Sequence, residues 1–241
     1  MLDPALAWTN TDGVKTRFVS IDEAKSIGGG VAVVIDVVRA FTTAAWAFHL
    51  AAERIVLTDD LGEALRLKAR LPGSLALKDG EPEPGFDLTN SPVHLKLRND
   101  LQGRTIVQRT THGTIGAVAA RGANLLYCAS FVCASATASA IRDGETEVWF
   151  VVTGDGGKAE EDLACAEFIA ALIGDPHSLA GSYVSRVGLS AAAERVTALA
   201  HSGSKGFDAG DVAMCMEVDR FDFSMRATIE DGLLVLRRVV A

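Results

Sequence analysis

Apolar runs separated by short polar turns recur along this chain. The first clear run, VAVVI at 31–35, has no polar break, which is typical of a strand buried on both faces. It ends at Asp36, and the apolar segment 44–52 that follows is compatible with a helix. The same order of strand, polar turn and helix returns over 103–122, 124–141 and 147–174. These four units predict an α/β fold in which the strands share one sheet.

Weaker signals lie between these units. Before the first unit, residues 14–20 predict a strand, and Ser20 with Glu23 fits a capping box at the start of a short helix. After it, residues 53–60 predict a strand and residues 61–71 a helix that stops at a Pro-Gly pair. The segment 74–95 begins as a strand and continues as a loop with three prolines. Loops of this length inside compact domains are often functional.

From residue 175 onward the pattern changes. Residues 185–203 predict one or two helices, and the apolar runs 213–218 and 232–241 predict strands. No Pro- or Ser-rich linker and no strong internal repeat interrupts the sequence. We therefore predict a single domain over 1–241, with residues 175–241 as a C-terminal extension of that domain.

Composition narrows the class of protein. Hydrophobic residues make up 49% of the 241 residues and charged residues 22%, which supports a sizeable core. The formal net charge of −8 argues against a nucleic-acid surface, but one arginine or a metal could still bind a phosphorylated substrate. No apolar run approaches membrane-spanning length, and residues 1–13 lack the features of a secretory signal. A cytoplasmic location is expected; the oligomeric state is left open, with a homodimer as one possibility.

Four cysteines are scattered along the chain, at positions 128, 133, 165 and 215. None forms a CxxC pair, and no histidine stands at zinc-finger spacing. Their neighbours are mostly alanine, leucine, valine and methionine, which raise rather than lower the pKa of a thiol. We expect four free, mostly buried thiols without a catalytic role.

Polar groups follow each of the four predicted strands. They are Asp36, Arg39, Thr42 and Thr43 after the first, Thr110, Thr111, Gly113 and Thr114 after the second, Ser130 after the third, and Glu161 and Asp162 after the fourth. In a parallel sheet such strand ends lie at one edge, where they can form a common site. An alternative for the first group is that Asp36 caps the helix and Arg39 only pairs with it.

The chemistry of these groups favours phosphoryl transfer. Hydroxyls, glycines and an arginine suit an anion, whereas carboxylates suit Mg²⁺, which prefers oxygen ligands. The loop at 74–95 adds oxygen ligands at Asp79, Glu81, Asp87 and Asn90, of which Glu81 is a weaker candidate for the metal. We expect Asp36, Glu161 and Asp162 to converge within metal-binding reach. The alternative for the loop is a solvated surface.

Other chemistries lack their motifs. The chain has no GxxxxGK[ST] phosphate loop and no GxSxG nucleophile elbow. The glycines at 28–30 precede the buried strand, whereas a dinucleotide-binding loop follows its strand. Asp36 is followed by two valines, so the second aspartate typical of haloacid-dehalogenase phosphatases is absent.

Five segments together resemble the 2-phosphosulfolactate phosphatase (ComB-like) family. They are IDVVRAFTTAAWA, PGFDLTNSP, RTTHGTIGA, CASFVCASATA and GDGGKAEEDLACA, in this order between residues 31 and 174, with a fainter match through GFDAGDVAMCMEVD. The resemblance implies a three-layer α/β/α sandwich with a largely parallel or mixed sheet. It also implies Mg²⁺-dependent hydrolysis of 2-phospho-3-sulfolactate to 3-sulfolactate and phosphate, on the route to coenzyme M.

The resemblance assigns the polar groups named above to the family's site. Asn90 joins them from the second segment, and His112 stands where the family usually has asparagine. For His112 the alternatives are a neutral side chain that keeps the turn, or a donor to the substrate or general acid. The chain also reads DGEPEP where the family usually reads GERGG, so one arginine is missing beside Glu81. A missing arginine removes a bidentate donor for phosphate or sulfonate.

These observations lead to one main hypothesis and two alternatives. The main one is a Mg²⁺-dependent phosphatase of a small phosphorylated acid, in which Asp36, Arg39 and Glu161 are catalytic. We prefer metal-activated water as the nucleophile, and covalent catalysis by Asp36 stays open. One alternative is a metabolite-binding protein that keeps the fold without the chemistry, and another is a phosphatase for a different hydroxy acid. A nucleotide-cofactor enzyme is disfavoured because the fingerprint is missing.

Overall fold

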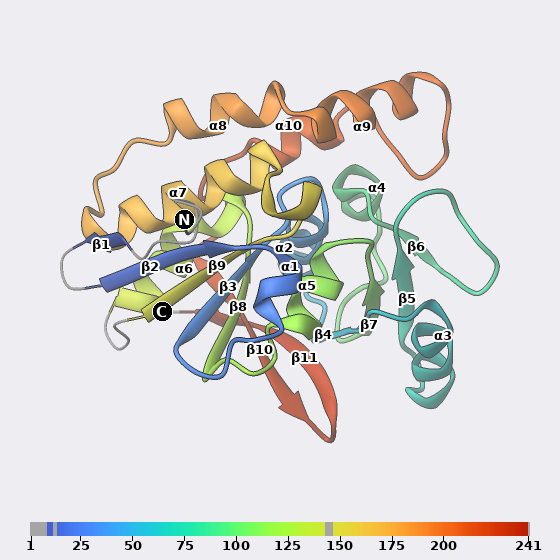
Figure 1. Ribbon diagram of the computed structural model, residues 1–241. Helices are drawn as coiled ribbons and strands as arrows, with labels where there is room; N and C mark the ends of the chain where they lie inside the picture. Colours follow the sequence, from blue (N-terminus) through green and yellow to red (C-terminus); the bar gives the residue numbers. More distant parts are fainter. Residues whose placement is uncertain (1–8, 12–13, 143–146, 241) are drawn as a thin grey trace.

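The computed structural model describes residues 9–11, 14–142 and 147–240 (Figure 1). The segment 1–13, for which no secretory signal is expected, lies largely outside these ranges. The strands are β1 Thr9–Thr11, β2 Val14–Val19, β3 Val31–Ile35, β4 Arg54–Leu57, β5 Leu75–Lys78, β6 Leu88–Thr89, β7 Thr105–Arg109, β8 Leu125–Ala129, β9 Glu147–Val152, β10 Phe223–Glu230 and β11 Leu233–Val240.

Ten α-helices and two short 3₁₀ turns connect these strands within the described residues. The helices are α1 Ile21–Ala24, α2 Ala40–His49, α3 Leu61–Arg70, α4 Pro92–Lys96, α5 Gly113–Ala119, α6 Ala134–Arg142, α7 Glu160–Gly174, α8 Gly181–Gly188, α9 Ala191–His201 and α10 Asp211–Cys215. The 3₁₀ turns are η2 Phe131–Cys133 and η3 Asp155–Gly157. No helix in the described part of the chain is both long and apolar enough to span a membrane.

All eleven strands belong to one sheet, in the order β1-β2-β9-β3-β8-β10-β11-β4-β7-β5-β6. Strands β2, β9, β3 and β8 are parallel neighbours, and β4, β7, β5 and β6 form a second parallel group. The antiparallel hairpin of β10 and β11 joins the two groups. The sheet is therefore mixed.

The hairpin of β10 and β11 changes which strand ends lie at the same edge of the sheet. Three successive antiparallel pairings separate β8 from β4, so the second parallel group runs counter to the first along the sheet. The carboxyl ends of β7 and β3 therefore do not lie at the same edge of a parallel sheet, although the sequence argument assumed that they do. The turn after β7 and helix α5 nevertheless pack against β3 and α2. Strand twist and the path of α5, rather than parallel order alone, bring the two turns together.

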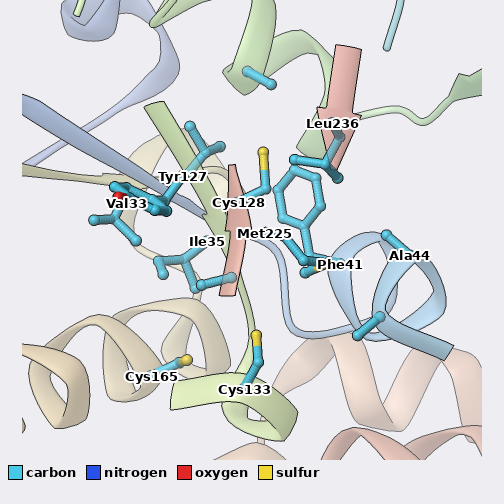
Figure 2. Close-up of a cluster of buried hydrophobic side chains, with 14 of the residues drawn as sticks. Val33, Ile35, Phe41, Ala44, Tyr127, Cys128, Cys133, Cys165, Met225 and Leu236 are labelled. Carbon is cyan, nitrogen blue, oxygen red and sulfur yellow. The ribbon is translucent and has the colours of Figure 1, made fainter. Parts of the chain in front are cut away.

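Helices cover both faces of the sheet, which confirms the three-layer α/β/α sandwich. Helix α5 packs closely on the Val34 side of β3, where a Cβ added at Gly116 would lie 2.9 Å from Val34 Cγ1. The alternate residues Val33 and Ile35 lie on the side of Cys165 in α7 and Cys133 at the end of η2 (Figure 2). Successive side chains of a strand point to opposite faces, so a strand buried on both sides must be apolar throughout.

The core is built from small and branched side chains around β3. All five residues of β3 are fully buried, and helix α2 is buried at every position from Ala40 to Phe48. Phe41, Met225 and Leu236 pack together beside Cys128 (Figure 2). Ser20 and Glu23 form the expected capping box at the start of α1. The central apolar stretch is thus the centre of the fold, as its pattern predicts.

The C-terminal region differs from prediction in two respects. The run 213–218, expected to be a strand, has its first three residues in helix α10 and none in a strand, whereas 232–241 contains strand β11 as expected. Strand β10 was not predicted. Helices α8 and α9 occupy the predicted helical segment, and with α10 they form a row along the top of Figure 1. A six-residue apolar run fits a strand or a buried helix equally well, so periodicity could not decide it.

Candidate active site

Asp36 stands between the buried strand β3 and helix α2. Its side chain is 7% exposed, and its Oδ1 accepts the Ala40 backbone N–H at 2.9 Å. The Asp36 carbonyl also accepts the Phe41 N–H at 3.1 Å. Asp36 therefore does bond the first turn of α2, as the alternative held. The same carboxylate also lines a cavity, so a bond to the helix and a place in a site are compatible for Asp36.

Glu161 and Asp162 lie in the first turn of α7 and are 5% and 3% exposed. Asp162 Oδ1 accepts the Val37 backbone N–H at 2.8 Å, and Oδ2 accepts the Gly154 N–H at 3.1 Å. The Thr153 hydroxyl lies 3.2 Å from Oδ2. Asp162 thus ties the start of α7 to the residue that follows Asp36, across 125 positions of sequence.

All three carboxylates line a cavity of about 540 Å³, which we call the carboxylate cavity. The rest of its lining is more varied and includes Val38, His112, Asp155, Lys158, Glu160, Ser190, Ala192 and Arg195. Asp36, Glu161 and Asp162 thus line one cavity. The described residues nevertheless contain no group of three His, Cys, Asp or Glu side chains that could hold a metal ion, so the three carboxylates do not converge within metal-binding reach as expected. The carboxylates outnumber the cationic groups around it.

The pKa values of these carboxylates are raised. Burial, with the neighbouring charges of Asp79 and Glu161, raises the pKa of Asp36 to about 7, against the opposing backbone N–H groups of Ala40 and Gly113. Burial, then the charges of Asp36 and Glu161, raises the pKa of Asp162 well above its usual range. The pKa of Glu161 is also raised, mainly by burial. Carboxyl groups held this close favour a shared cation or a retained proton.

The donor chemistry fits Mg²⁺. Buried carboxylate oxygens are the ligands that this ion prefers, and their raised pKa values show that the folded chain leaves their charge poorly compensated. Within the described ranges, however, no three His, Cys, Asp or Glu side chains are already grouped as a complete ligand set. Mg²⁺ usually keeps several waters and takes only one or two carboxylates together with substrate phosphate. Asp36 and Glu161 are buried carboxylates of this kind in the cavity lining.

The threonine turn lies directly against Asp36. Thr110 and Thr114 bond each other, with the Thr110 N–H donating to Thr114 Oγ1 at 2.8 Å and the Thr114 N–H donating to Thr110 Oγ1 at 3.0 Å. A Cβ added at Gly113 would lie 2.8 Å from Asp36 Oδ2 and 2.7 Å from Ala40 Cβ. Only glycine fits this contact. Thr110 and Thr114 are fully buried and shape the turn, whereas Thr111 and His112 are exposed.

Arg39 lines a second, smaller cavity of about 260 Å³, which we call the arginine cavity. The Arg39 guanidinium donates from Nη1 to Asp211 Oδ2 at 2.6 Å and to the Gly206 carbonyl at 3.0 Å, and it stacks on Phe207 at 4.3 Å. The Val38–Arg39 peptide is cis. Arg39 does pair with an aspartate, but its partner is Asp211 and not Asp36.

Asn90 also lines the arginine cavity and is 3% exposed. Its Nδ2 donates to Asp79 Oδ1 at 2.6 Å, and Asp79 Oδ2 accepts the Thr111 N–H. Asp79 thus connects the loop after β5 with the threonine turn. Glu81 is exposed and lines neither cavity, so the carboxylate that this loop brings near Asp36 is Asp79.

Thr42, Thr43 and Ser130 are fully buried and line neither cavity. Thr42 Oγ1 donates to the Val37 carbonyl at 2.9 Å and lies 3.1 Å from Ser130 Oγ. Thr43 Oγ1 has no hydrogen-bond partner in the described chain. The Thr42 hydroxyl therefore supports the turn after Asp36, with Ser130 beside it. A direct contact of any of them with substrate stays a prediction.

Sequence reasoning missed two residues that shape both cavities. Asp211 is fully buried and accepts hydrogen bonds from Arg39, the Ser91 hydroxyl and the Asp208 N–H. Arg195 of α9 lines both cavities. Asp211 lies within the faint C-terminal match, which was the available signal. No motif marked Arg195, because one arginine on an amphipathic helix is ordinary.

Comparison with known proteins agrees with this geometry. The profile of the 2-phosphosulpholactate phosphatase family matches residues 19–227. A "Probable 2-phosphosulfolactate phosphatase" of Bacillus subtilis (strain 168) is 30% identical over 214 residues, which is 86% of this chain and 91% of that protein. The protein with the same name from Carboxydothermus hydrogenoformans is 30% identical over 225 residues, 89% of this chain and 93% of that protein. This chain belongs to the 2-phosphosulpholactate phosphatase family, a family of phosphoric monoester hydrolases.

Proposed function

We propose that this protein hydrolyses 2-phospho-3-sulfolactate to 3-sulfolactate and phosphate in a Mg²⁺-dependent reaction. The observation that carries the proposal is the convergence of Asp36, Glu161 and Asp162, each buried and each with a raised pKa, on one cavity. The names of the relatives support the substrate. The route to coenzyme M and a cytoplasmic location belong to the same proposal, and the four free buried cysteines suit a reducing compartment.

Asp36 and Glu161 would hold Mg²⁺. When bound, the ion would polarise the phosphoryl oxygens and offset their negative charge. Asp162 contributes mainly by orientation, because both of its oxygens already accept backbone N–H groups. Its bond to Val37 holds the Asp36 turn against α7. A phosphate ester that enters this cavity is thus positioned by rigid elements and not by loops alone.

In the metal-free protein, burial raises the pKa of Asp36 to about 7, so Asp36 must give up its proton near neutral pH before it can hold Mg²⁺. Its Oδ1 is fixed by the Ala40 N–H, and its Oδ2 faces the close contact with Gly113. The preferred nucleophile is water activated in the cavity. Attack by the Asp36 carboxylate is the competing mechanism. It would form an aspartyl phosphate that water then cleaves at phosphorus, so it gives retention of configuration at an isotopically chiral phosphorus, whereas direct attack by water gives inversion.

The test is phosphate release from 2-phospho-3-sulfolactate and other small phosphomonoesters, with Mg²⁺ or with EDTA. We expect turnover that requires Mg²⁺ and that falls by at least about 100-fold in Asp36→Asn, the scale of losing a group that acts in the transition state. Asp22→Asn, which removes an exposed carboxylate of α1, is the matched control and should keep the turnover of the natural protein and its dependence on Mg²⁺. Undiminished turnover in EDTA would contradict the Mg²⁺ part of the proposal.

A metabolite-binding protein without the chemistry is the second candidate. The DGEPEP segment favours it, because it lacks the arginine that the family usually has there. Such a protein would raise its melting temperature when 3-sulfolactate or the phosphorylated acid is added, yet release no phosphate from any ester. A phosphatase for a different hydroxy acid would show turnover with another member of the panel.

A further inference from the structure

The carboxylate cavity and the arginine cavity are neighbours with a common wall. Four residues line both of them: Val38, His112, Ala192 and Arg195. Val38 and His112 come from the turns after β3 and β7, whereas Ala192 and Arg195 come from helix α9. A ligand with two chemically different ends can therefore place one end in each cavity.

The two cavities differ in charge. Asp36, Glu161 and Asp162 make the first one acidic, so it suits a metal and a phosphoryl group. The second is lined by Arg39, Arg195 and Asp79. The Asp79 carboxylate accepts hydrogen bonds from Asn90 and the Thr111 N–H, and the charge of Arg39 is compensated by Asp211, which is fully buried beside it. Arg39 and Asp211 together are close to neutral. An anion in the arginine cavity would need another cation.

Arg195 is placed to supply that cation. Its side chain is exposed, and within the described chain no carboxylate lies in salt-bridge distance of it. An arginine at the common wall, with its fork of donors unused, can pair with a planar carboxylate or with a sulfonate.

Asn90 gives an independent sign of a ligand in the arginine cavity. It is 3% exposed and its Nδ2 is bound to Asp79, yet its Oδ1 has no hydrogen-bond partner among the described residues. A buried acceptor without a donor costs free energy, so such groups usually meet a ligand or an ordered water. A hydroxy acid or water bound beside Arg195 would supply the missing donor.

We propose that Arg195 binds the acid group of the substrate in the arginine cavity while the phosphoryl group occupies the carboxylate cavity. Arg195 is then the residue that selects phosphorylated acids over simple phosphate esters. The inference rests on the proposed phosphatase function and adds the residue that sets its substrate class. The anion recognised is a carboxylate or a sulfonate, since both accept two parallel N–H donors.

Three phosphate esters test whether Arg195 binds a carboxylate or a sulfonate. 2-Phospholactate carries a carboxylate, the phosphate ester of 2-hydroxyethanesulfonate carries a sulfonate, and propyl phosphate carries neither. In Arg195→Ala we expect kcat/KM to fall by roughly 10- to 100-fold for the esters whose acid group Arg195 binds, the scale of a lost charge-assisted contact. The value for propyl phosphate should change by less than about threefold, because that ester makes no such contact. Arg195→Lys should recover part of the loss. Arg66→Ala, which removes an exposed arginine from α3, is the charge-matched control.

Binding provides a readout that does not need turnover. Titration calorimetry with 3-sulfolactate should show weaker binding by Arg195→Ala than by the natural protein, whereas Arg66→Ala should bind normally. That result supports the inference even if no ester is hydrolysed, in which case only the phosphatase proposal fails. An equal loss of kcat/KM for all three esters, or unchanged 3-sulfolactate binding in Arg195→Ala, would overturn the role of Arg195.

Discussion

Arg39 and Asp211 form a buried ion pair, with 2.6 Å between Nη1 and Oδ2, across 172 positions of sequence. Asp211 also accepts the Ser91 hydroxyl at 2.6 Å and thereby fixes the start of α4. One carboxylate thus joins the starts of α2 and α4 to α10. Ion pairs buried this deeply are sensitive to the loss of one partner, because the other is left charged and unpaired.

Replacement of Asp211 should therefore be costly. We expect Asp211→Ala to lower the free energy of unfolding by about 3–5 kcal/mol, the range for breaking a buried pair. The double variant Arg39→Met with Asp211→Leu should be less destabilised than Asp211→Ala, because no buried charge is left alone. Urea denaturation measures both, and Asp222→Asn, at an exposed position, is the control. Equal stability of Asp211→Ala and the control would show that the pair contributes little.

Gly113→Ala should damage the site directly. The added Cβ would lie 2.8 Å from Asp36 Oδ2 and 2.7 Å from Ala40 Cβ, so the turn or the carboxylate must move. We expect a fall in turnover of at least about tenfold and a stability loss of about 1–3 kcal/mol, as for overpacking in a core. Gly181→Ala, where an added Cβ meets nothing within 4 Å, should leave both quantities nearly unchanged. Normal turnover of Gly113→Ala would mean that Asp36 need not keep its position.

The pH dependence of stability should reflect Asp36. Its pKa is about 7 in the folded protein, whereas an unfolded chain titrates at about 3.9, so the folded state binds more protons between these values. Without metal, stability should fall as the pH rises from about 4 to about 7, by at most about 1.4 kcal/mol per pH unit from this group. Asp36→Asn should flatten this fall and be more stable than the natural protein at pH of about 8.

Denaturation in EDTA across this pH range checks the expectation, with Asp22→Asn as the exposed control. Mg²⁺ added at the alkaline end should stabilise the natural protein and have less effect on Asp36→Asn, because a ligand that binds only the folded state raises its stability. A natural protein whose stability rises steadily with pH would contradict the raised pKa of Asp36.

The four cysteines should be unreactive in the folded protein. All are free and buried, as expected from their neighbours, and burial raises the pKa of Cys133 to about 11 and that of Cys165 well above its usual range. A thiol reagent at pH of about 8 should label almost none of them until the protein unfolds, since the thiolate is the reactive form. Cys133→Ser and Cys165→Ser should keep normal turnover if they fold. Rapid labelling of Cys133 in the native state would assign it a reactive role.

Much of the local structure follows from the sequence alone. The unbroken run of β3 predicts a strand buried on both faces, and the capping box at Ser20 predicts the start of α1. The convergence of Asp36 with Glu161 follows from strand order, because β3 and β9 are parallel neighbours in the sheet. These features are encoded in patterns a few residues long, where burial and hydrogen bonding act locally.

Only the tertiary structure decided how the distant parts meet. The hairpin of β10 and β11 reverses the second group of strands, and no periodicity along the chain predicts its insertion between β8 and β4. The same holds for the partner of Arg39, since Asp211 lies just before a short apolar run, 213–218, that fits a strand as well as a helix. Arg195 became a candidate only when α9 was seen to line both cavities. Such pairings depend on long-range packing and charge compensation, which a chain acquires only when it folds.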